Sequence, residues 1–418
     1  RLKAAVQSPG TEAESILSPD SLRHSKPDLV LQSRVEMAIV YNGSAGSNRL
    51  MAESVFPYDE IIRMYGYGGN DELTGAFLNP NEIFGGTGND TLRGGADVNL
   101  LDGGDGDDIL NAWMGDYSIL RGGVGNDVLT GGDRGGLLDG GAGADTMTGG
   151  EGGDTYLVNH LRDVVMESYR PYYDNDPNPA DQVSAWVSWT LGANLENLIL
   201  QGKGAINGTG NGLSNLIVGN AGNNSLYGGR GSDTIEGGLG NDTIDGGTGV
   251  DTVRFTASTA VVVNLSKTAA QNTGAGLDVI RNVENVVTGA GSDRVTGNAA
   301  GNSLTAGSGN DLLSGKGGND RLSGGAGNDR LSGGAGNDRL SGGSGADHFL
   351  FSTGGGADRI TDFADGIDRI VINSGAQAFG QVSIADLGSD ARVSFGDVTI
   401  TLSNVDHSRL GVDDFIFT

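Results

Sequence analysis

Aspartate recurs every nine residues within glycine-rich segments, and this period constrains the fold more than any other feature of the chain. Residues 315–350 read GKGGNDRLS, GGAGNDRLS, GGAGNDRLS and GGSGADHFL. A short unit repeated in register predicts a stack of similar coils, because one unit alone cannot bury its apolar side chain. The aspartates of this segment are Asp311, Asp320, Asp329, Asp338 and Asp347.

The same period appears in two earlier segments. Asp233, Asp242 and Asp251 keep the spacing of nine. Upstream the spacing is looser, and it indicates one-residue slips with degenerate copies in between. The aspartates there are Asp71, Asp90, Asp108, Asp127, Asp145 and Asp154, with gaps of 19, 18, 19, 18 and 9 residues.

Some copies carry asparagine where aspartate is expected. Asn224 and Asn302 stand at this position, and Asn81 lies in the degenerate stretch after Asp71. We expect these turns either to hold the coil without a metal ion or to bind one weakly through neutral oxygens.

The repeat at residues 324–332, GGAGNDRLS, illustrates the local structure. Its glycines suit a tight loop that leaves backbone carbonyls uncovered. Arg330 to Ser332 form a short strand with Leu331 pointing inward. Two nonapeptides complete one coil, so residues 18 apart stack. This register predicts a stack of Leu313, Leu331 and the side chains around Phe349 on one side, with Leu322 and Leu340 on the other.

The loop chemistry points to calcium. A single aspartate in a glycine-rich loop is usually a turn residue. About a dozen copies in register are different, because stacked carboxylates repel one another unless a cation lies between them. Carbonyl and carboxylate oxygens are the ligands that Ca²⁺ prefers.

We therefore expect several calcium ions, each between stacked loops. The candidate ligands are Asp71, Gly86, Gly88, Asp90, Gly104, Gly106, Asp108, Gly123, Gly125, Asp127, Gly141, Gly143, Asp145, Asp154, Gly229, Gly231, Asp233, Gly238, Gly240, Asp242, Gly247, Gly249, Asp251, Asp293, Asp311, Gly318, Asp320, Gly325, Gly327, Asp329, Gly334, Gly336, Asp338, Gly343, Gly345 and Asp347.

The composition is consistent with a fold that is stabilised by bound metal ions. The 418 residues contain 76 glycines and no cysteine, and 53 acidic against 26 basic residues give a net charge of −27. Such a charge disfavours nucleic acid and anionic membranes as partners, and it destabilises a compact state unless cations neutralise it. The lack of cysteine excludes disulfides and thiolate metal sites. The sequence has no apolar run long enough to cross a bilayer.

The nonapeptides resemble those of the RTX (repeats-in-toxin) family of hemolysin-type calcium-binding proteins. The resemblance implies parallel β-rolls that hold calcium. Residues 356–372, GADRITDFADGIDRIVI, resemble the serralysin-like cap that follows such repeats. Residues 412–418, VDDFIFT, resemble the C-terminal signal of type I secretion, and no N-terminal secretory signal is visible. The resemblance thus implies the type I machinery as a partner and an extracellular location.

The predicted fold is all-β, with parallel β-roll blocks, linking β segments and a β-rich C-terminal cap. Strand-like content at 29–41 lies in an N-terminal lead-in. The expected division of the chain is 1–60 lead-in, 61–157 first block, 158–201 linking segment, 202–254 second block, 255–288 linking segment, 289–351 third block and 352–418 cap.

We find no catalytic motif. The four histidines are scattered, and neither HExxH nor GxSxG occurs. The sequence therefore predicts no catalytic or organic-cofactor residues and a non-enzymatic protein that acts structurally or as an adhesin, binding cell-surface glycans or itself. The alternative is the non-catalytic RTX portion of a secreted hydrolase or polysaccharide-modifying enzyme.

Overall fold

The computed structural model describes residues 38–418, except 57–58, 168–179 and 257. Most of the predicted lead-in, residues 1–37, therefore lies outside the described residues. The described chain consists of β-strands and three short 3₁₀ turns, η2 (Phe379–Gln381), η3 (His407–Arg409) and η4 (Val412–Asp414). The all-β prediction is confirmed. Within this part of the chain, no helix has the length and apolarity needed to cross a membrane.

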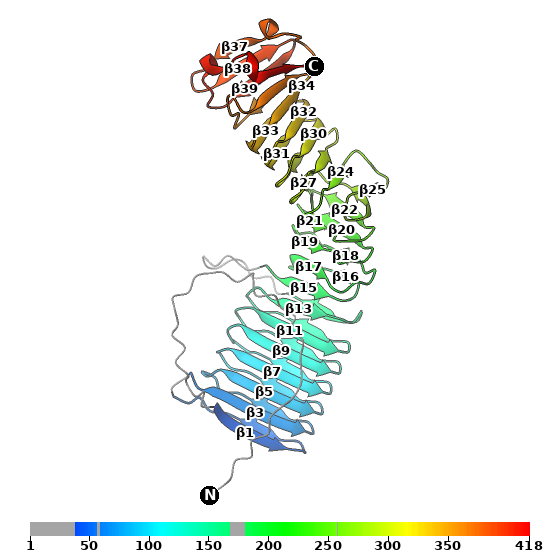
Figure 1. The fold of residues 1–418 in the computed structure, drawn as a ribbon. Helices are drawn as coiled ribbons and strands as arrows, with labels where there is room; N and C mark the ends of the chain where they lie inside the picture. The colour runs from blue at the N-terminus through cyan, green and yellow to red at the C-terminus, as the bar shows by residue number, and fades with distance from the viewer. Residues whose placement is uncertain (1–37, 57–58, 168–179, 257) are drawn as a thin grey trace. The chain divides into compact units, whose positions relative to one another are not determined.

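One parallel ladder, which we call the continuous ladder, receives a strand from nearly every coil (Figure 1). Its order follows the sequence, and it ends where β39 pairs antiparallel with β38 (Ala391–Phe395), which pairs in turn with β37 (Ser383–Asp386). Its strands are β1 (Ala38–Ser44), β3 (Ile61–Gly68), β5 (Asn81–Thr87), β7 (Asn99–Asp105), β9 (Ser118–Val124), β11 (Gly136–Ala142), β13 (Thr155–Val158), β15 (Gln182–Ala185), β17 (Asn197–Leu200), β19 (Leu216–Val218), β21 (Thr234–Glu236), β23 (Thr252–Arg254), β27 (Asn285–Val287), β29 (Ser303–Thr305), β31 (Arg321–Ala326), β33 (Arg339–Ser344), β35 (Ala357–Ile360) and β39 (Val398–Leu402).

The remaining strands of the coils form three short ladders, one after another. The first contains β2 (Arg49–Met51), β4 (Glu72–Thr74), β6 (Thr91–Arg93), β8 (Ile109–Asn111), β10 (Val128–Thr130), β12 (Thr146–Thr148) and β14 (Val164–Met166). The second contains β16 (Trp189–Thr190), β18 (Gly208–Thr209), β20 (Ser225–Arg230), β22 (Thr243–Thr248) and β26 (Leu277–Arg281). The third contains β24 (Val262–Asn264), β28 (Arg294–Thr296), β30 (Leu312–Gly317), β32 (Arg330–Ala335), β34 (His348–Phe351), β36 (Arg369–Ile372) and β40 (Phe415–Phe417).

The predicted register of 18 residues is confirmed in the third block. Leu331 pairs with Leu313 on one side and with Phe349 on the other, and Leu322 pairs with Leu340. All five side chains are fully buried. The core is therefore a thin stack of apolar side chains, and each coil depends on its neighbours for burial.

The linking segments belong to the same coil. In the segment 158–201, β15 pairs with β13 on one side and β17 on the other, so the continuous ladder passes through without interruption. Only the short ladders are interrupted here, because β14 ends the first short ladder and β16 begins the second.

In the segment 255–288, the second and third short ladders are connected by strands that pair out of sequence order. β24 precedes β26 in sequence, yet β26 extends the second ladder while β24 starts the third. Between them lies β25 (Gln271–Asn272), which pairs antiparallel with β26, and the Val262 N–H donates to the Thr273 carbonyl at 3.1 Å. The chain thus runs one coil ahead and returns, and the backbone groups between the two ladders stay paired.

The C-terminal segment completes both sides of the coil. β35 pairs with β39, and β36 pairs with β40, so the last strands close the continuous ladder and the third short ladder. The serralysin-like character of this cap stays a prediction.

Candidate calcium sites

The loops that precede the strands stack into two columns. We call the loops before the short-ladder strands the short-ladder column, and those before the continuous-ladder strands the continuous-ladder column. In the third block Asp311, Asp329 and Asp347 lie in the first column, and Asp320 and Asp338 in the second.

In every predicted aspartate ligand except Asp154, one carboxylate oxygen is held by a backbone N–H of the preceding coil. The Asp311 N–H donates to Asp329 Oδ1 at 2.8 Å, and the Asp320 N–H donates to Asp338 Oδ1 at 2.8 Å. The other blocks repeat this bond, as between Asp233 and Asp251 at 2.8 Å. The carboxylates of one column therefore lie directly above one another.

The second oxygen has no such partner. In the part of the chain that the structure describes, fifteen aspartates that are at most 3% exposed each bury one carboxylate oxygen without a hydrogen bond. A buried polar atom without a partner is costly, and a buried charge more so. They are the fifteen aspartates predicted as ligands from the sequence: Asp71, Asp90, Asp108, Asp127, Asp145, Asp154, Asp233, Asp242, Asp251, Asp293, Asp311, Asp320, Asp329, Asp338 and Asp347.

The unpartnered oxygen faces a carbonyl oxygen of the next coil. A Cβ atom built on Gly324 would meet Asp329 Oδ2 and, at 2.6 Å, the Gly342 carbonyl oxygen. The space beside this glycine is therefore lined by one carboxylate and one carbonyl oxygen from successive coils. These are hard oxygen donors, so the residues fit the calcium ion predicted from the sequence. Binding itself stays a prediction.

Glycine at the fourth position of the loop is needed for coils to stack. Gly327 has a φ of +137°, and a Cβ atom there would collide with the Gly309 carbonyl oxygen of the coil before it. Any side chain would push the two loops apart and misplace the carbonyl groups. The glycines of the pattern therefore shape the loops that carry the aspartates.

Burial also changes the acidity of these aspartates. Burial, together with the charges of neighbouring aspartates in the same column, raises the pKa of Asp108 to about 7 and that of Asp127 to about 6. The pKa of Asp320 and that of Asp329 rise to about 6 for the same reasons. Without cations, the folded coil therefore resists ionisation of the carboxylates that line it.

In three loops, asparagine stands in place of the aspartate and both polar atoms of its amide form hydrogen bonds with the backbone. Asn302 Oδ1 accepts from the Asn298 N–H of its own loop at 2.8 Å, and its Nδ2 donates to the Glu284 carbonyl of the coil before at 2.9 Å. Asn215 and Asn224 make the same pair of bonds. Both polar atoms of each amide are therefore satisfied by backbone groups. Of the two expectations, this geometry favours loops that hold the coil without a metal ion.

Up to Asp145, the first block has aspartate ligands in one column only. From Asp71 to Asp145 every predicted ligand lies in the short-ladder column, while the continuous-ladder column has neutral residues at the equivalent position. Asn81 Nδ2 donates to Asn99 Oδ1 at 2.9 Å, and Asn99 Nδ2 donates to Ser118 Oγ at 3.3 Å. This alternation explains why the aspartate gaps in this block are close to 18 rather than 9.

Carboxylates outside the nonapeptides end the columns, and the sequence analysis missed them. Asp163 Oδ1 accepts from the Asp145 N–H, and Asp368 Oδ1 accepts from the Asp347 N–H at 2.9 Å. Their second oxygens accept from nearby backbone N–H groups, as from Ala364 to Asp368 at 2.8 Å. These two carboxylates therefore need no ion. Asp163 keeps the spacing of nine after Asp154, which is a sequence signal, whereas Asp368 is marked only as an acidic residue directly before an apolar strand.

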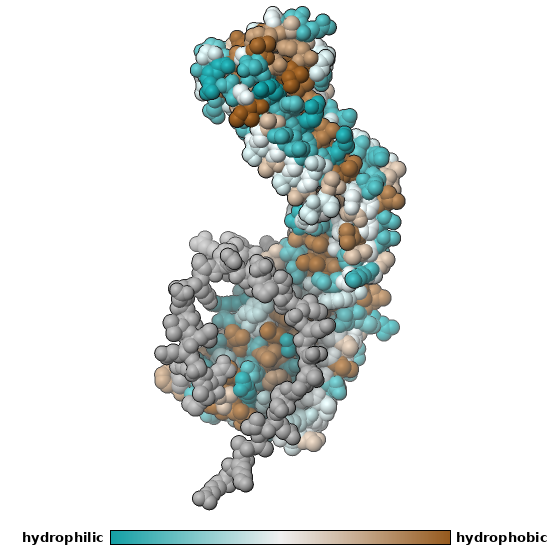
Figure 2. Space-filling view, viewed as in Figure 1, coloured by the Kyte–Doolittle hydropathy of each residue, from teal (hydrophilic) through white to brown (hydrophobic). Residues whose placement is uncertain are grey.

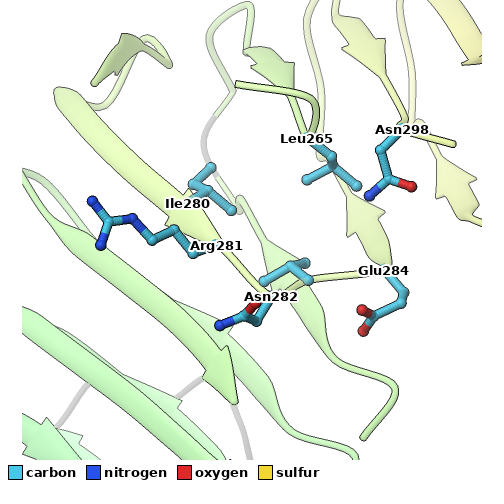
Figure 3. A pocket seen from close by; sticks show the side chains of 7 residues that line it. Leu265, Ile280, Arg281, Asn282, Glu284 and Asn298 are labelled. Carbon is cyan, nitrogen blue, oxygen red and sulfur yellow. The ribbon is translucent and has the colours of Figure 1, made fainter. Parts of the chain in front are cut away.

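A small pocket of about 190 Å³ lies beside the junction of the second and third short ladders (Figure 3). Its polar groups are already engaged. Glu284 Oε2 accepts from the Asp251 N–H at 2.8 Å, and Asn282 Nδ2 donates to Asp245 Oδ1 at 2.8 Å. Arg281 points away from Glu284 in the close-up. The groups that line this pocket therefore support the coil.

Two aspartates of one loop provide a matched test of the sites. Asp108 is buried with an unpartnered oxygen, whereas Asp105, three residues earlier, is exposed. We expect Asp108→Asn to raise the calcium concentration needed for folding and to cost about 1–3 kcal/mol at saturating calcium. Asp105→Asn removes the same charge and should leave the midpoint unchanged. Calcium titration followed by circular dichroism measures both, and equal midpoints would contradict the site.

The raised pKa values predict how the metal-free protein responds to pH. An aspartate whose pKa is raised on folding binds protons more tightly when folded, so its contribution to stability is present at low pH. That contribution is lost as pH rises through the folded pKa of about 6 to 7. In calcium-free buffer, the β signal should therefore be stronger at about pH 5.5 than at about pH 8. Saturating calcium should abolish the difference, and a calcium-free β signal that grows with pH would refute this account.

A known protein family matches the repeat segments of this chain. The family described as RTX calcium-binding nonapeptide repeat matches residues 84–119, 121–156, 209–244, 218–253, 287–322 and 314–349. The chain matches none of the curated proteins.

Two solved structures are similar in part. The extracellular lipase LipA from Serratia marcescens is 20% identical over 58% of this chain and 45% of the lipase, with a TM-score of 0.26. The AlgE6R3 subunit of the Azotobacter vinelandii mannuronan C5-epimerase is 31% identical over 29% of this chain and 80% of that subunit, with a TM-score of 0.26. This chain therefore spans less than half of the lipase. The segments matched by the family are RTX calcium-binding nonapeptide repeats.

Proposed function

We propose that this protein is secreted, folds on calcium outside the cell and serves a structural or adhesive role at the cell surface or in the surrounding matrix. The fifteen buried aspartates with an unpartnered oxygen carry the proposal. Each needs a positive partner when ionised, and the neighbouring carbonyl oxygens complete a set of ligands suited to calcium.

The charge of the chain makes folding conditional. With a net charge of −27, the coil brings like charges together in its columns. Extracellular calcium modules bind with a Kd of about 10⁻⁴ to 10⁻³ M. At cytosolic calcium levels such sites stay empty, and repulsion opposes folding. Outside the cell the ions bind only the folded state and stabilise it by mass action.

Export and surface attachment are separate parts of the proposal. Export rests on the resemblance of residues 412–418 to a type I secretion signal. In the folded chain, β40 within this segment pairs with β36. An unfolded chain in the calcium-poor cell would leave the segment available to the export machinery.

The surface suits contacts made through ions and polar groups. Teal and white atoms, with smaller brown areas, cover the visible face of the third block (Figure 2). The strands there repeat outward-facing arginines, Arg321, Arg330 and Arg339, at nine-residue intervals. Many equivalent polar loops on one rigid coil favour repeated weak contacts with glycans or with a second copy of the chain.

The alternative is that these repeats are the non-catalytic portion of a secreted hydrolase or polysaccharide-modifying enzyme. The repeats have the same calcium chemistry in that case. The mass of the native secreted polypeptide separates the two proposals, because an attached catalytic domain would make it larger than this chain.

The folding proposal predicts a calcium switch. Without calcium the purified chain should show little β signal and a large hydrodynamic radius. Millimolar calcium should produce the β spectrum and a smaller radius, because ion binding offsets the repulsion. Circular dichroism and size-exclusion chromatography measure this, with magnesium as the control ion. The same β spectrum with and without calcium would rule out the switch.

The adhesive role predicts binding without turnover. The calcium-loaded chain should bind cells, acidic polysaccharides or itself, and chelator should release it. The same preparation should not hydrolyse casein, lipid esters or acidic polysaccharides, because catalysis needs a defined pocket with a base or nucleophile. Turnover abolished by a point mutation in this chain would overturn the non-enzymatic proposal.

A further inference from the structure

Three carboxylates meet where the first short ladder ends and the continuous ladder proceeds. Asp154 precedes β13, Glu167 directly follows β14, and Asp181 precedes β15. One oxygen from each lies within 4.8 Å of the others. Among the described residues, this is the only group of three acidic, histidine or cysteine side chains at such distances. Glu167 and Asp181 lie outside the nonapeptides, and neither was predicted as a ligand.

The oxygen atoms of this cluster differ in kind from those of a regular loop. Beside the first glycine of a regular loop, the aspartate oxygen faces a carbonyl oxygen of the next coil. At Gly149 a Cβ atom would meet Tyr156 Oη, Glu167 Oε2 and, at 2.6 Å, Asp154 Oδ2. Side-chain oxygens thus stand where the backbone carbonyl stands elsewhere. Glu167 follows Gly149 by 18 residues, so it occupies the stacked position of that glycine in the next coil.

Asp154 is the buried, unsatisfied member of the cluster. It is 1% exposed, its Oδ2 accepts from the Gly150 N–H at 2.9 Å, and its Oδ1 has no hydrogen bond. In the other predicted ligands the unpartnered atom is Oδ2. Asp181 is 5% exposed, and its Oδ1 accepts from the Asp154 N–H at 2.7 Å. The carboxylate of Asp154 therefore has one oxygen that still requires a positive partner.

Tyr156 adds a neutral oxygen to the cluster. It stacks on Leu138 of the preceding coil and is fully buried at a position where the neighbouring coils carry leucine or valine. Its hydroxyl donates to Glu167 Oε2. The phenol thus replaces an inward aliphatic side chain and brings a polar atom to the carboxylates.

We propose that Asp154, Glu167 and Asp181 bind one hard divalent cation, calcium in the extracellular medium, with the Tyr156 hydroxyl beside it. This site would be built from side chains, unlike the repeat loops, and it would tie the end of β14 to the start of β15. Three carboxylates and a phenol oxygen are hard ligands of the kind calcium takes. Only the identity of the ion rests on the proposed function.

The test compares two glutamates close in sequence. Glu167→Gln removes one ligand charge of the cluster, and Glu151→Gln removes the same charge from an exposed position in the adjoining loop. Calcium bound at saturation is counted by equilibrium dialysis, with folding confirmed by circular dichroism. We expect Glu167→Gln to bind about one ion fewer than wild type, and Glu151→Gln to match wild type. An unchanged count in folded Glu167→Gln overturns the site.

Terbium provides a second measurement that does not depend on the glutamate variant folding. Tb³⁺ replaces calcium and emits when a nearby tyrosine is excited. Tyr156→Phe keeps the three carboxylates and should lower the emission while the number of bound ions stays the same. Unchanged emission would overturn the proposal. If wild type already has its β fold without calcium, the proposed function fails instead, and terbium emission through Tyr156 still tests this cluster.

Discussion

The fold depends on the second oxygen of each buried aspartate. In all of them except Asp154, the first oxygen is satisfied by an N–H of the preceding coil, so the backbone of one coil positions the carboxylate of the next. The second oxygen is buried against a carbonyl group and has no donor. Stacking of apolar side chains from successive strands favours the coil, whereas the row of carboxylates opposes it when they are ionised. The balance between these two terms sets when the chain folds.

That balance differs along the chain. In the first block, from Asp71 to Asp145, one column is acidic and the other is closed by asparagine and serine bonds. In the third block both columns are acidic. Self-satisfied asparagine loops stand near the start of the second and third blocks, at 210–215, 219–224 and 297–302. The coils with neutral loops have the least repulsion to overcome, and those of the third block have the most.

Much of this could be predicted from the sequence, because the nonapeptide is a local code. Its glycines, its aspartate and its single leucine determine loop, ligand and core, and the register of 18 follows from two units per coil. The rest depends on loops of other lengths. The reversal around β25 and the carboxylate Asp368 break the period, so no pattern marks them. Asp163 keeps the spacing of nine after Asp154, but it lies outside a glycine-rich loop. Glu167 and Asp154 come together only because the first short ladder ends at β14 in the folded chain. Such a contact depends on tertiary structure and leaves no local sequence pattern.

The register of two nonapeptides per coil also limits how such a gene can change length. Repeats 324–332 and 333–341 are identical in sequence, so recombination between them would remove nine residues. A loss of nine would send every later strand to the wrong side, and the segment that now forms β39 would face the third short ladder rather than the continuous ladder it closes. A loss or gain of eighteen shortens or lengthens the stack by one coil, about 4.8 Å, and leaves the cap in place. Viable length variants of this chain should therefore differ by even numbers of repeats.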